Sequence, residues 1–170
     1  CKIVTIEGIG VDGLSVIQKS FIKAGAVQCG YCTPGMIMAA TTILKENRNP
    51  DRREIRRRLG GNICRCTGYA KIIEAIELAR DILNGEKSEK CLEAVHPDTS
   101  RMIGSCAKRV DALGKVTGAL EYAGDMEMSR MLHIHLVRST EAHAEIVSIN
   151  CEKALEMPGV ECVVTSEDVP

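Results

Sequence analysis

Hydrophobic residues recur at helical spacing in three stretches of the first half of the chain, at residues 14–23, 36–46 and 69–83. A run with a 3.6-residue period gives a helix one apolar face, which it buries against its neighbours. A shorter, strongly basic stretch at residues 51–59 has room for two helical turns with a solvated, charged face. The pattern therefore predicts a four-helix-bundle-like first domain.

Residues that commonly begin or end helices flank these stretches. Gly25 can end the first helix, because glycine readily adopts the left-handed conformation found at helix ends. Thr33 and Thr67 are candidate N-caps of the second and last helices, and Asp51 of the basic one, since a side-chain oxygen can accept a hydrogen bond from a free backbone N–H. Pro34 suits a first helical turn, where its missing N–H is not needed.

The second half of the chain has a different pattern, in which short apolar runs alternate with glycines and prolines. Such runs predict strands at residues 132–137, 146–149 and 160–165, with a short helix at about 153–157 before the last strand. Another short strand is predicted at residues 2–6. The second half is therefore expected to be mixed α/β, and the whole chain to have an α+β fold.

A stretch with mixed charges, one proline and no sustained periodicity separates the two patterns. It covers residues 85–105 and has the composition of an interdomain linker. We therefore divide the chain into a helical domain at residues 1–84, this linker, and a mixed α/β segment at residues 106–170.

The composition argues against several classes of function. The 170 residues carry a formal net charge of −1 and include one Phe, three Tyr and no Trp, so neither a basic field nor many stacking rings are available for nucleic acid. No apolar run approaches the roughly twenty residues that span a bilayer, and no charged-then-apolar leader opens the sequence. We expect a cytoplasmic protein that binds neither nucleic acid nor membrane.

The nine cysteines are the strongest chemical signal. Four of them form two close pairs, Cys29 with Cys32 and Cys64 with Cys66, and a reducing compartment favours metal binding or redox chemistry for paired cysteines. The other five are scattered singly, and free cysteine commonly behaves as a small apolar or surface residue. These five are Cys1, Cys91, Cys106, Cys151 and Cys162.

The spacing of the two pairs predicts a shared metal centre. Two residues separate Cys29 from Cys32, one separates Cys64 from Cys66, and 31 lie between the pairs. Four thiolates suit either a [2Fe-2S] cluster or a tetrahedral zinc ion. Structural zinc sites usually keep at least two residues between paired cysteines, so the single-residue spacing favours iron and leaves zinc as an alternative.

The flanking residues add an electrostatic reason for iron. Each pair directly precedes a predicted helix, whose free backbone N–H groups and positive dipole end favour an anionic cluster. Hydrogen bonds to the cluster sulfurs would stabilise its reduced form. Gly30, Gly35 and Gly68 carry no Cβ, which allows the backbone to wrap closely around the site.

Two motifs carry a family resemblance. The segments QCGYCTPGM at residues 28–36 and GNICRCTGY at residues 61–69 resemble the second iron–sulfur domain of the xanthine dehydrogenase and aldehyde oxidase family. The segment TIEG at residues 5–8 is similar to the strand that leaves the family's first, plant-ferredoxin-like cluster domain. Residues 1–8 are therefore interpreted as the tail of that first domain.

The resemblance continues past the linker. Short motifs there resemble the opening of the family's α/β hammerhead domain, which begins its molybdenum-cofactor portion. The motifs are RVD at residues 109–111, KVTG at 115–118, Tyr122, Asp125, RS at 138–139, AHA at 142–144 and PGV at 158–160. Residues 106–170 are therefore assigned to a partial hammerhead domain.

The resemblance implies an electron-transfer fragment of a molybdenum-containing hydroxylase that oxidises aldehydes or N-heterocycles such as purines. Cys29, Cys32, Cys64 and Cys66 would hold the [2Fe-2S] cluster, and Gln28 and Cys66 match positions that lie against the molybdopterin. The family's substrate site lies outside these residues, so no catalytic residue is expected in this chain. Two alternatives stay open, a binding module stabilised by zinc and a free-standing [2Fe-2S] electron carrier.

The implied partners are the remaining parts of the hydroxylase, namely its first [2Fe-2S] domain and its molybdopterin domain. Family members with a flavin domain in the same chain insert it between the iron–sulfur part and the hammerhead domain. Only about twenty linker residues intervene here, which is far too few for a domain. Any flavin is therefore expected on a separate subunit.

Overall fold

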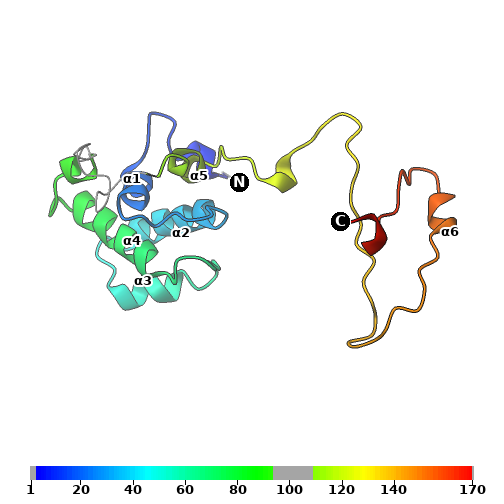
Figure 1. Ribbon diagram of the computed structural model, residues 1–170. Coiled ribbons are helices and arrows are strands. Elements are labelled where there is room, and N and C mark those ends of the chain that lie inside the picture. Colours follow the sequence, from blue (N-terminus) through cyan, green and yellow to red (C-terminus); the bar gives the residue numbers. More distant parts are fainter. Residues whose placement is uncertain (1–2, 94–108, 170) are drawn as a thin grey trace, which may run out of the picture. The chain divides into compact units, whose positions relative to one another are not determined.

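The computed structural model describes residues 3–93 and 109–169, which divide into two units, Cys1–Met126 and Glu127–Pro170. Helices α1 to α5 belong to the first unit and α6 to the second (Figure 1). Their bounds are Val16–Lys23 (α1), Thr33–Glu46 (α2), Arg52–Arg58 (α3), Ala70–Leu83 (α4), Ala112–Thr117 (α5) and Glu152–Leu155 (α6). Short 3-10 turns lie at Ile6–Gly8, Glu89–Leu92, Ala123–Asp125 and Ser166–Asp168.

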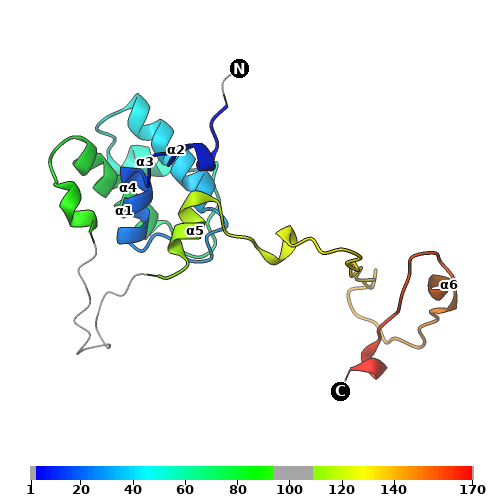
Figure 2. The same cartoon turned by 90° about the horizontal axis from the view of Figure 1, so that it is seen from above.

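The first unit has its core between helices α1 to α4, with α1 packed most extensively on α4 (Figure 2). Each of these helices contributes fully buried apolar side chains, and each such side chain stabilises the folded state by roughly 1.5–3 kcal/mol. They include Phe21, Met36, Ile37, Ile43, Ile55, Ile72 and Ile76. Because these are the positions of the helical hydrophobic pattern, the packing confirms the four helices predicted for the first half.

Helix α5 follows the segment 94–108 and packs against α1 and α2. Val116 of α5 is fully buried, and its carbonyl oxygen accepts a hydrogen bond of 2.9 Å from the buried amide Nε2 of Gln18. Gly118 ends α5 with a φ of 78°, and a Cβ there would lie 2.6 Å from Cγ2 of Ile6. Residues 109–126 are therefore packed as part of the first unit.

The predicted linker at residues 85–105 lies partly outside the described residues. Its described part, residues 85–93, includes the turn Glu89–Leu92, in which Leu92 is buried. Lys19 of α1 forms an ion pair of 2.6 Å with Glu89, which ties this turn to the helical body.

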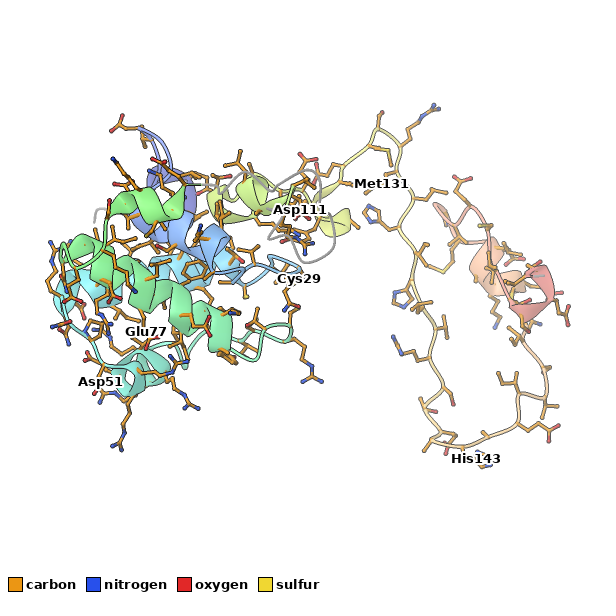
Figure 3. All side chains as sticks on the ribbon, turned by 60° about the vertical axis from the view of Figure 1, so that its left-hand side comes forward. Cys29, Asp51, Glu77, Asp111, Met131 and His143 are labelled. Carbon is orange, nitrogen blue, oxygen red and sulfur yellow. The ribbon has the colours of Figure 1, made fainter. Side chains whose placement is uncertain are left out.

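The strands predicted for the second half do not form among residues 127–169, which follow an extended, unpaired course around α6 and the turn Ser166–Asp168. Figure 3 shows this chain at Met131 and His143. Ile134 is 92% exposed and Val147 is 93% exposed, so the apolar side chains of two predicted strands lack a packing partner. A strand needs a neighbouring strand for its backbone hydrogen bonds and a second layer for its apolar face. The short helix predicted at about 153–157 does form, as α6.

The strand predicted at residues 2–6 is also absent from its described part. Residues 3–5 have no regular structure, and the 3-10 turn Ile6–Gly8 follows them. The described part of the chain is therefore mostly helical rather than α+β, and the mixed α/β character predicted for residues 106–170 does not appear in residues 109–169.

Local hydrogen bonds explain where two of the helices begin. At the start of α1 the backbone N–H of Gln18 donates to Oγ of Ser15 over 3.3 Å, and the backbone N–H of Ser15 donates to Oε1 of Gln18 over 2.8 Å. At the start of α3 the carboxylate of Asp51 accepts a hydrogen bond of 2.6 Å from the backbone N–H of Glu54. The prediction of Asp51 as an N-cap is therefore confirmed.

The other two predicted caps are wrong. Thr33 is the buried first residue of α2, and Cys32 occupies the N-cap position before it. Tyr69 is the N-cap of α4, with a left-handed φ of 67°, and its backbone N–H donates a hydrogen bond of 3.1 Å to Oγ1 of Thr67. In both cysteine-bearing loops the N-cap position is therefore occupied by a residue other than the predicted threonine.

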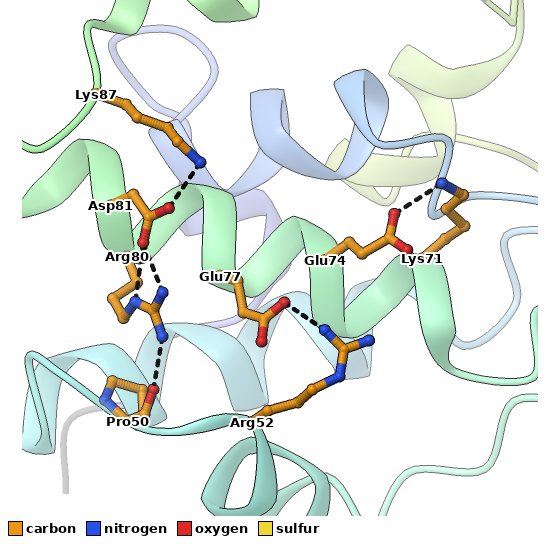
Figure 4. Close-up of polar contacts among 8 residues, drawn as sticks. All are labelled: Pro50, Arg52, Lys71, Glu74, Glu77, Arg80, Asp81 and Lys87. Atoms are coloured by element: carbon orange, nitrogen blue, oxygen red, sulfur yellow. Dashed lines mark hydrogen bonds and ion pairs between the residues drawn. The ribbon is translucent and has the colours of Figure 1, made fainter.

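Helix α4 is joined to the start of α3 by a polar cluster around the buried Asp81 (Figure 4). The guanidinium of Arg80 donates to Asp81 over 2.7 Å and to the carbonyl oxygen of Pro50 over 3.0 Å, and Lys87 pairs with Asp81 over 2.8 Å. Burial alone would raise the pKa of Asp81, but the hydrogen bonds from Lys87 and Arg80 lower it. The carboxylate is therefore held ionised inside the fold.

Candidate metal centre

The first cysteine loop, residues 29–32, leads directly into α2. The backbone N–H of Thr33 donates to the carbonyl oxygen of Gly30 over 3.0 Å, and that of Met36 donates to the carbonyl oxygen of Cys32 over 2.9 Å. The loop therefore ends in the first turn of a 14-residue helix, whose positive dipole end favours negative charge nearby. Cys29 is exposed and Cys32 is partly buried.

The second loop, residues 60–69, connects α3 to α4 and is held by the side chain of Tyr69. The Tyr69 hydroxyl accepts a hydrogen bond of 2.9 Å from the backbone N–H of Cys64 and donates one of 3.2 Å to the carbonyl oxygen of Asn62. Cys64 is buried and Cys66 is exposed. The sequence places Tyr69 in the motif GNICRCTGY and at the start of the predicted helix, but no local pattern indicates that its hydroxyl holds the loop.

The thiols of the two loops lie close enough to shift each other's pKa. The thiolate of Cys29 accepts hydrogen bonds from the backbone N–H of Tyr31 and from the thiol of Cys66, and these bonds lower the pKa of Cys29. The same contact with Cys29 raises the pKa of Cys66. One thiol of each loop therefore forms a first pair, Cys29 with Cys66.

The second pair also joins the two loops. Burial, followed by the hydrogen bond to Cys64, raises the pKa of Cys32 to about 12. Burial alone would raise the pKa of Cys64 as well, but hydrogen bonds from the Thr67 side chain, from the backbone N–H groups of Thr67 and Cys66 and from the Cys32 thiol lower it. The Thr67 hydroxyl oxygen lies 3.1 Å from the Cys64 sulfur. The pKa of Cys64, like that of Cys29, is therefore lowered, which favours the thiolate form of one thiol in each pair.

This donor set fits a [2Fe-2S] cluster. Each iron in such a cluster takes two thiolates, and the four thiols form two pairs, each with one member from each loop. Negative charge on Cys64 acts on Cys29, Cys32 and Cys66, so all four sulfurs share one neighbourhood. Within residues 3–93 and 109–169, no three His, Cys, Asp or Glu side chains are gathered closely enough to hold a single metal ion.

Two glycines allow close approach at this centre. A Cβ on Gly35 of α2 would lie 2.7 Å from Oδ1 of Asn62, where the two loops meet. Gly30 has a φ of 93°, and a Cβ there would lie 2.5 Å from the Lys115 side chain. Both residues therefore allow close packing here, Gly35 against the second loop and Gly30 against the Lys115 side chain of α5. A Cβ on Gly68 would meet nothing within 4 Å, so there the requirement is a backbone φ of 60° rather than space.

Residues from beyond the linker also reach the first loop, which the sequence analysis missed. Lys115 of α5 donates a hydrogen bond of 2.9 Å from Nζ to the carbonyl oxygen of Gln28, and the hydroxyl of Tyr122 donates one of 3.1 Å to that of Cys29. The rings of Tyr31 and Tyr122 meet edge to face, with centroids 5.5 Å apart. Lys115 and Gln28, like Tyr122 and Cys29, are about 90 residues apart in sequence, so no local pattern could indicate these contacts.

The outer side of the centre is exposed. Gln28 and Cys66, the two residues expected to face a molybdopterin, both lie on the surface. Their neighbours Tyr31 and Ile63 are 79% and 83% exposed, although both are large and apolar. This surface has the character of one that a partner covers.

Of the five remaining cysteines, three lie in the described residues. Cys91 and Cys162 are exposed free thiols and Cys151 is partly buried, which agrees with their interpretation as ordinary residues. Cys1 and Cys106 lie outside the described residues. Among the described residues, no helix is both long enough and apolar enough to cross a membrane.

Comparison with known families places both cysteine loops in an iron–sulfur protein domain, since residues 5–77 match the [2Fe-2S] binding domain. Residues 117–170 match the aldehyde oxidase and xanthine dehydrogenase, a/b hammerhead domain. The chain therefore belongs to the aldehyde oxidase and xanthine dehydrogenase family, as its motifs predicted.

Individual relatives agree with this assignment. The chain is 39% identical, over 99% of its length, to an aldehyde oxidoreductase of Megalodesulfovibrio gigas, of which it covers 19%. It is 53% identical, over 45% of its length, to half of the nicotinate dehydrogenase small FeS subunit of Eubacterium barkeri. The crystal structure of the aldehyde oxidoreductase from Desulfovibrio desulfuricans matches 98% of the chain with a TM-score of 0.80 and 40% identity, and the chain covers 19% of it. The chain thus spans about a fifth of the aldehyde oxidoreductases that it matches.

Proposed function

We propose that this chain is the electron-relay part of a molybdenum-containing hydroxylase, with a [2Fe-2S] cluster held by Cys29, Cys32, Cys64 and Cys66. The observation that carries the proposal is that four thiols from two loops lie close enough to shift one another's pKa, inside a [2Fe-2S] binding domain. When bound, such a cluster accepts and releases one electron at a time. With this pairing, Cys29 and Cys66 would hold one iron and Cys32 and Cys64 the other.

The surrounding groups of the chain favour negative charge at these sulfurs. The Thr67 hydroxyl lies against Cys64, and the backbone N–H of Tyr31 donates to Cys29. The N-terminal end of α2, with the positive end of its dipole, directly follows the same loop. Hydrogen bonds to cluster sulfurs raise the reduction potential, so these groups make the centre a better electron acceptor.

Gln28 and Cys66 are proposed to face the molybdopterin of the intact protein. Both residues are exposed, and the large apolar side chains of Tyr31 and Ile63 beside them are exposed as well. A cofactor-carrying domain docked there would cover this surface and bring its pterin close to the cluster. The reaction itself, hydroxylation of an aldehyde or an N-heterocycle, would then take place on residues outside this chain.

The domain division is proposed as residues 1–84 for the [2Fe-2S] domain, 85–105 for the linker and 106–170 for the start of the hammerhead domain. Residues 127–169 expose many apolar side chains at predicted strand positions, which suits a segment completed by further strands. The partners are therefore the rest of the hydroxylase, with any flavin on a separate cytoplasmic subunit. Hydrogen exchange would test this, because the amides of residues 132–137 should become protected only in the full-length protein.

Metal analysis with electron paramagnetic resonance tests the proposed function. The purified full-length protein should contain iron, and reduction with dithionite should produce a cluster signal that the Cys64→Ser variant lacks. Zinc in place of iron, with no such signal, would support the zinc-stabilised binding module instead. A complete reading frame that ends near Pro170, without a molybdopterin domain, would support the free-standing carrier.

A further inference from the structure

Three charged residues that follow the linker form one ion-paired cluster. Arg109 pairs with Asp111, and Asp111 accepts a second ion pair, of 2.6 Å, from Nζ of Lys115. Two cations share one carboxylate, so this charged triad carries a net positive charge. Lys115 is the member that reaches the loop, through its hydrogen bond to the carbonyl oxygen of Gln28.

The position of Lys115 makes its charge effective. The residue is only 5% exposed, and little water is available to screen a buried ammonium group. Its aliphatic stem lies so close to Gly30 that any Cβ there would overlap it.

The same segment holds the loop in place by other contacts. Tyr122 donates to the carbonyl oxygen of Cys29, next in the chain to the carbonyl that Lys115 binds. Val116 anchors α5 in the core, where its carbonyl accepts from Gln18. The triad is therefore fixed to the helical body rather than carried on a free surface arm.

We propose that the charged triad of Arg109, Asp111 and Lys115 is a positioning element that raises the reduction potential of the cluster held by the two cysteine loops. This inference rests on the proposed function. Taking up one electron makes the cluster more negative, and a fixed, poorly screened positive charge beside it stabilises the reduced form more than the oxidised form. Residues 109–126 then serve the iron–sulfur centre although they follow the linker.

A redox titration of the full-length protein, followed by electron paramagnetic resonance, tests this role. The relevant signal is the one that Cys64→Ser removes. In Lys115→Met, which keeps the stem and deletes the charge, the ratio of reduced to oxidised cluster at a fixed potential should fall on the order of tenfold. For a one-electron couple this shifts the midpoint about 59 mV toward more negative potential.

The matched control is Lys87→Met. Lys87 also pairs with an aspartate, Asp81. It follows the C-terminal end of α4, whereas the second cysteine loop precedes the N-terminal end of that helix. The midpoint potential of the cluster in Lys87→Met should equal that in the unmodified protein. A Lys115→Met variant that binds its cluster with an unchanged potential would overturn the inference.

The variant Asp111→Asn makes a prediction of opposite sign. It removes the only negative charge of the triad, so the midpoint should move to more positive potential. If Lys115→Met fails to bind a cluster, Asp111→Asn alone decides, and an unchanged or lower potential would contradict the inference. Absence of an iron–sulfur signal from the unmodified protein would instead defeat the proposed function.

Discussion

The two units of this chain contain similar apolar residues but use them in opposite ways. In the first unit the periodic isoleucines and leucines of α1 to α4 are buried together around Phe21. In residues 127–169 the apolar side chains of the predicted strands are largely exposed. A helix satisfies its backbone hydrogen bonds internally and needs only one packed face, whereas a strand depends on a neighbour for both. Local pattern is therefore enough for the helices and not for the strands.

Loss of the metal centre should change the stability of the first unit most, and so should most reduce its difference from the second unit. Cys64→Ser removes the one buried thiol among the four proposed cluster ligands, and metal ligation and folding are coupled. We expect the iron to be lost and the helical unit to lose about 2 kcal/mol or more, which lowers its melting temperature by roughly 8–16 °C. Iron assay and circular dichroism measure both effects. Cys91→Ser, at an exposed thiol, is the control and should change neither.

A core substitution should have the next largest effect. Ile76 is fully buried on α4, so Ile76→Ala should cost about 2–5 kcal/mol in the free energy of unfolding. Val147→Ala in the second unit removes an exposed side chain and should cost less than about 0.5 kcal/mol in this chain. Urea unfolding measures both. Equal costs would mean that residues 127–169 have a core of their own.

The cap of α3 provides a smaller test of the local contributions. Asp51→Ala removes the hydrogen bond from the backbone N–H of Glu54 and should cost about 1 kcal/mol. Asp51→Asn keeps an accepting oxygen and should cost less. If thermal unfolding shows the same loss for both variants, the charge of Asp51 rather than its hydrogen bond stabilises the helix.

The smallest expected effect is the acid dependence that Asp81 contributes. Its pKa is lowered in the folded protein, so it stabilises the fold above its unfolded pKa of roughly 4, and this contribution is lost as the pH falls through the folded value. Asp81→Asn should therefore be less stable than the unmodified chain at pH 7, with a difference that shrinks toward pH 2. Unfolding curves at several pH values measure it, and a difference independent of pH would contradict the assignment.

Particular residues show why the sequence predicted some elements and not others. The four main helices follow from apolar periodicity, and the Asp51 cap from one side chain and a backbone N–H three residues away. Helix α5 was not predicted, because it is six residues long and contains Gly114, and it is stabilised by the burial of Val116 in a distant core. Thr33 and Thr67 are good caps by type, yet the geometry of the cysteine loops gives those positions to Cys32 and Tyr69.

The sequence by itself determined helices α1 to α4, the family and the four cysteines proposed as ligands, because periodicity and short motifs are properties of neighbouring residues. Only the tertiary structure decided that Cys29 meets Cys66 and Cys32 meets Cys64, and that Lys115 and Tyr122 bind the first loop. These contacts join residues that are about 30 to more than 90 positions apart, and they form only when packing of the intervening helices brings their backbones together.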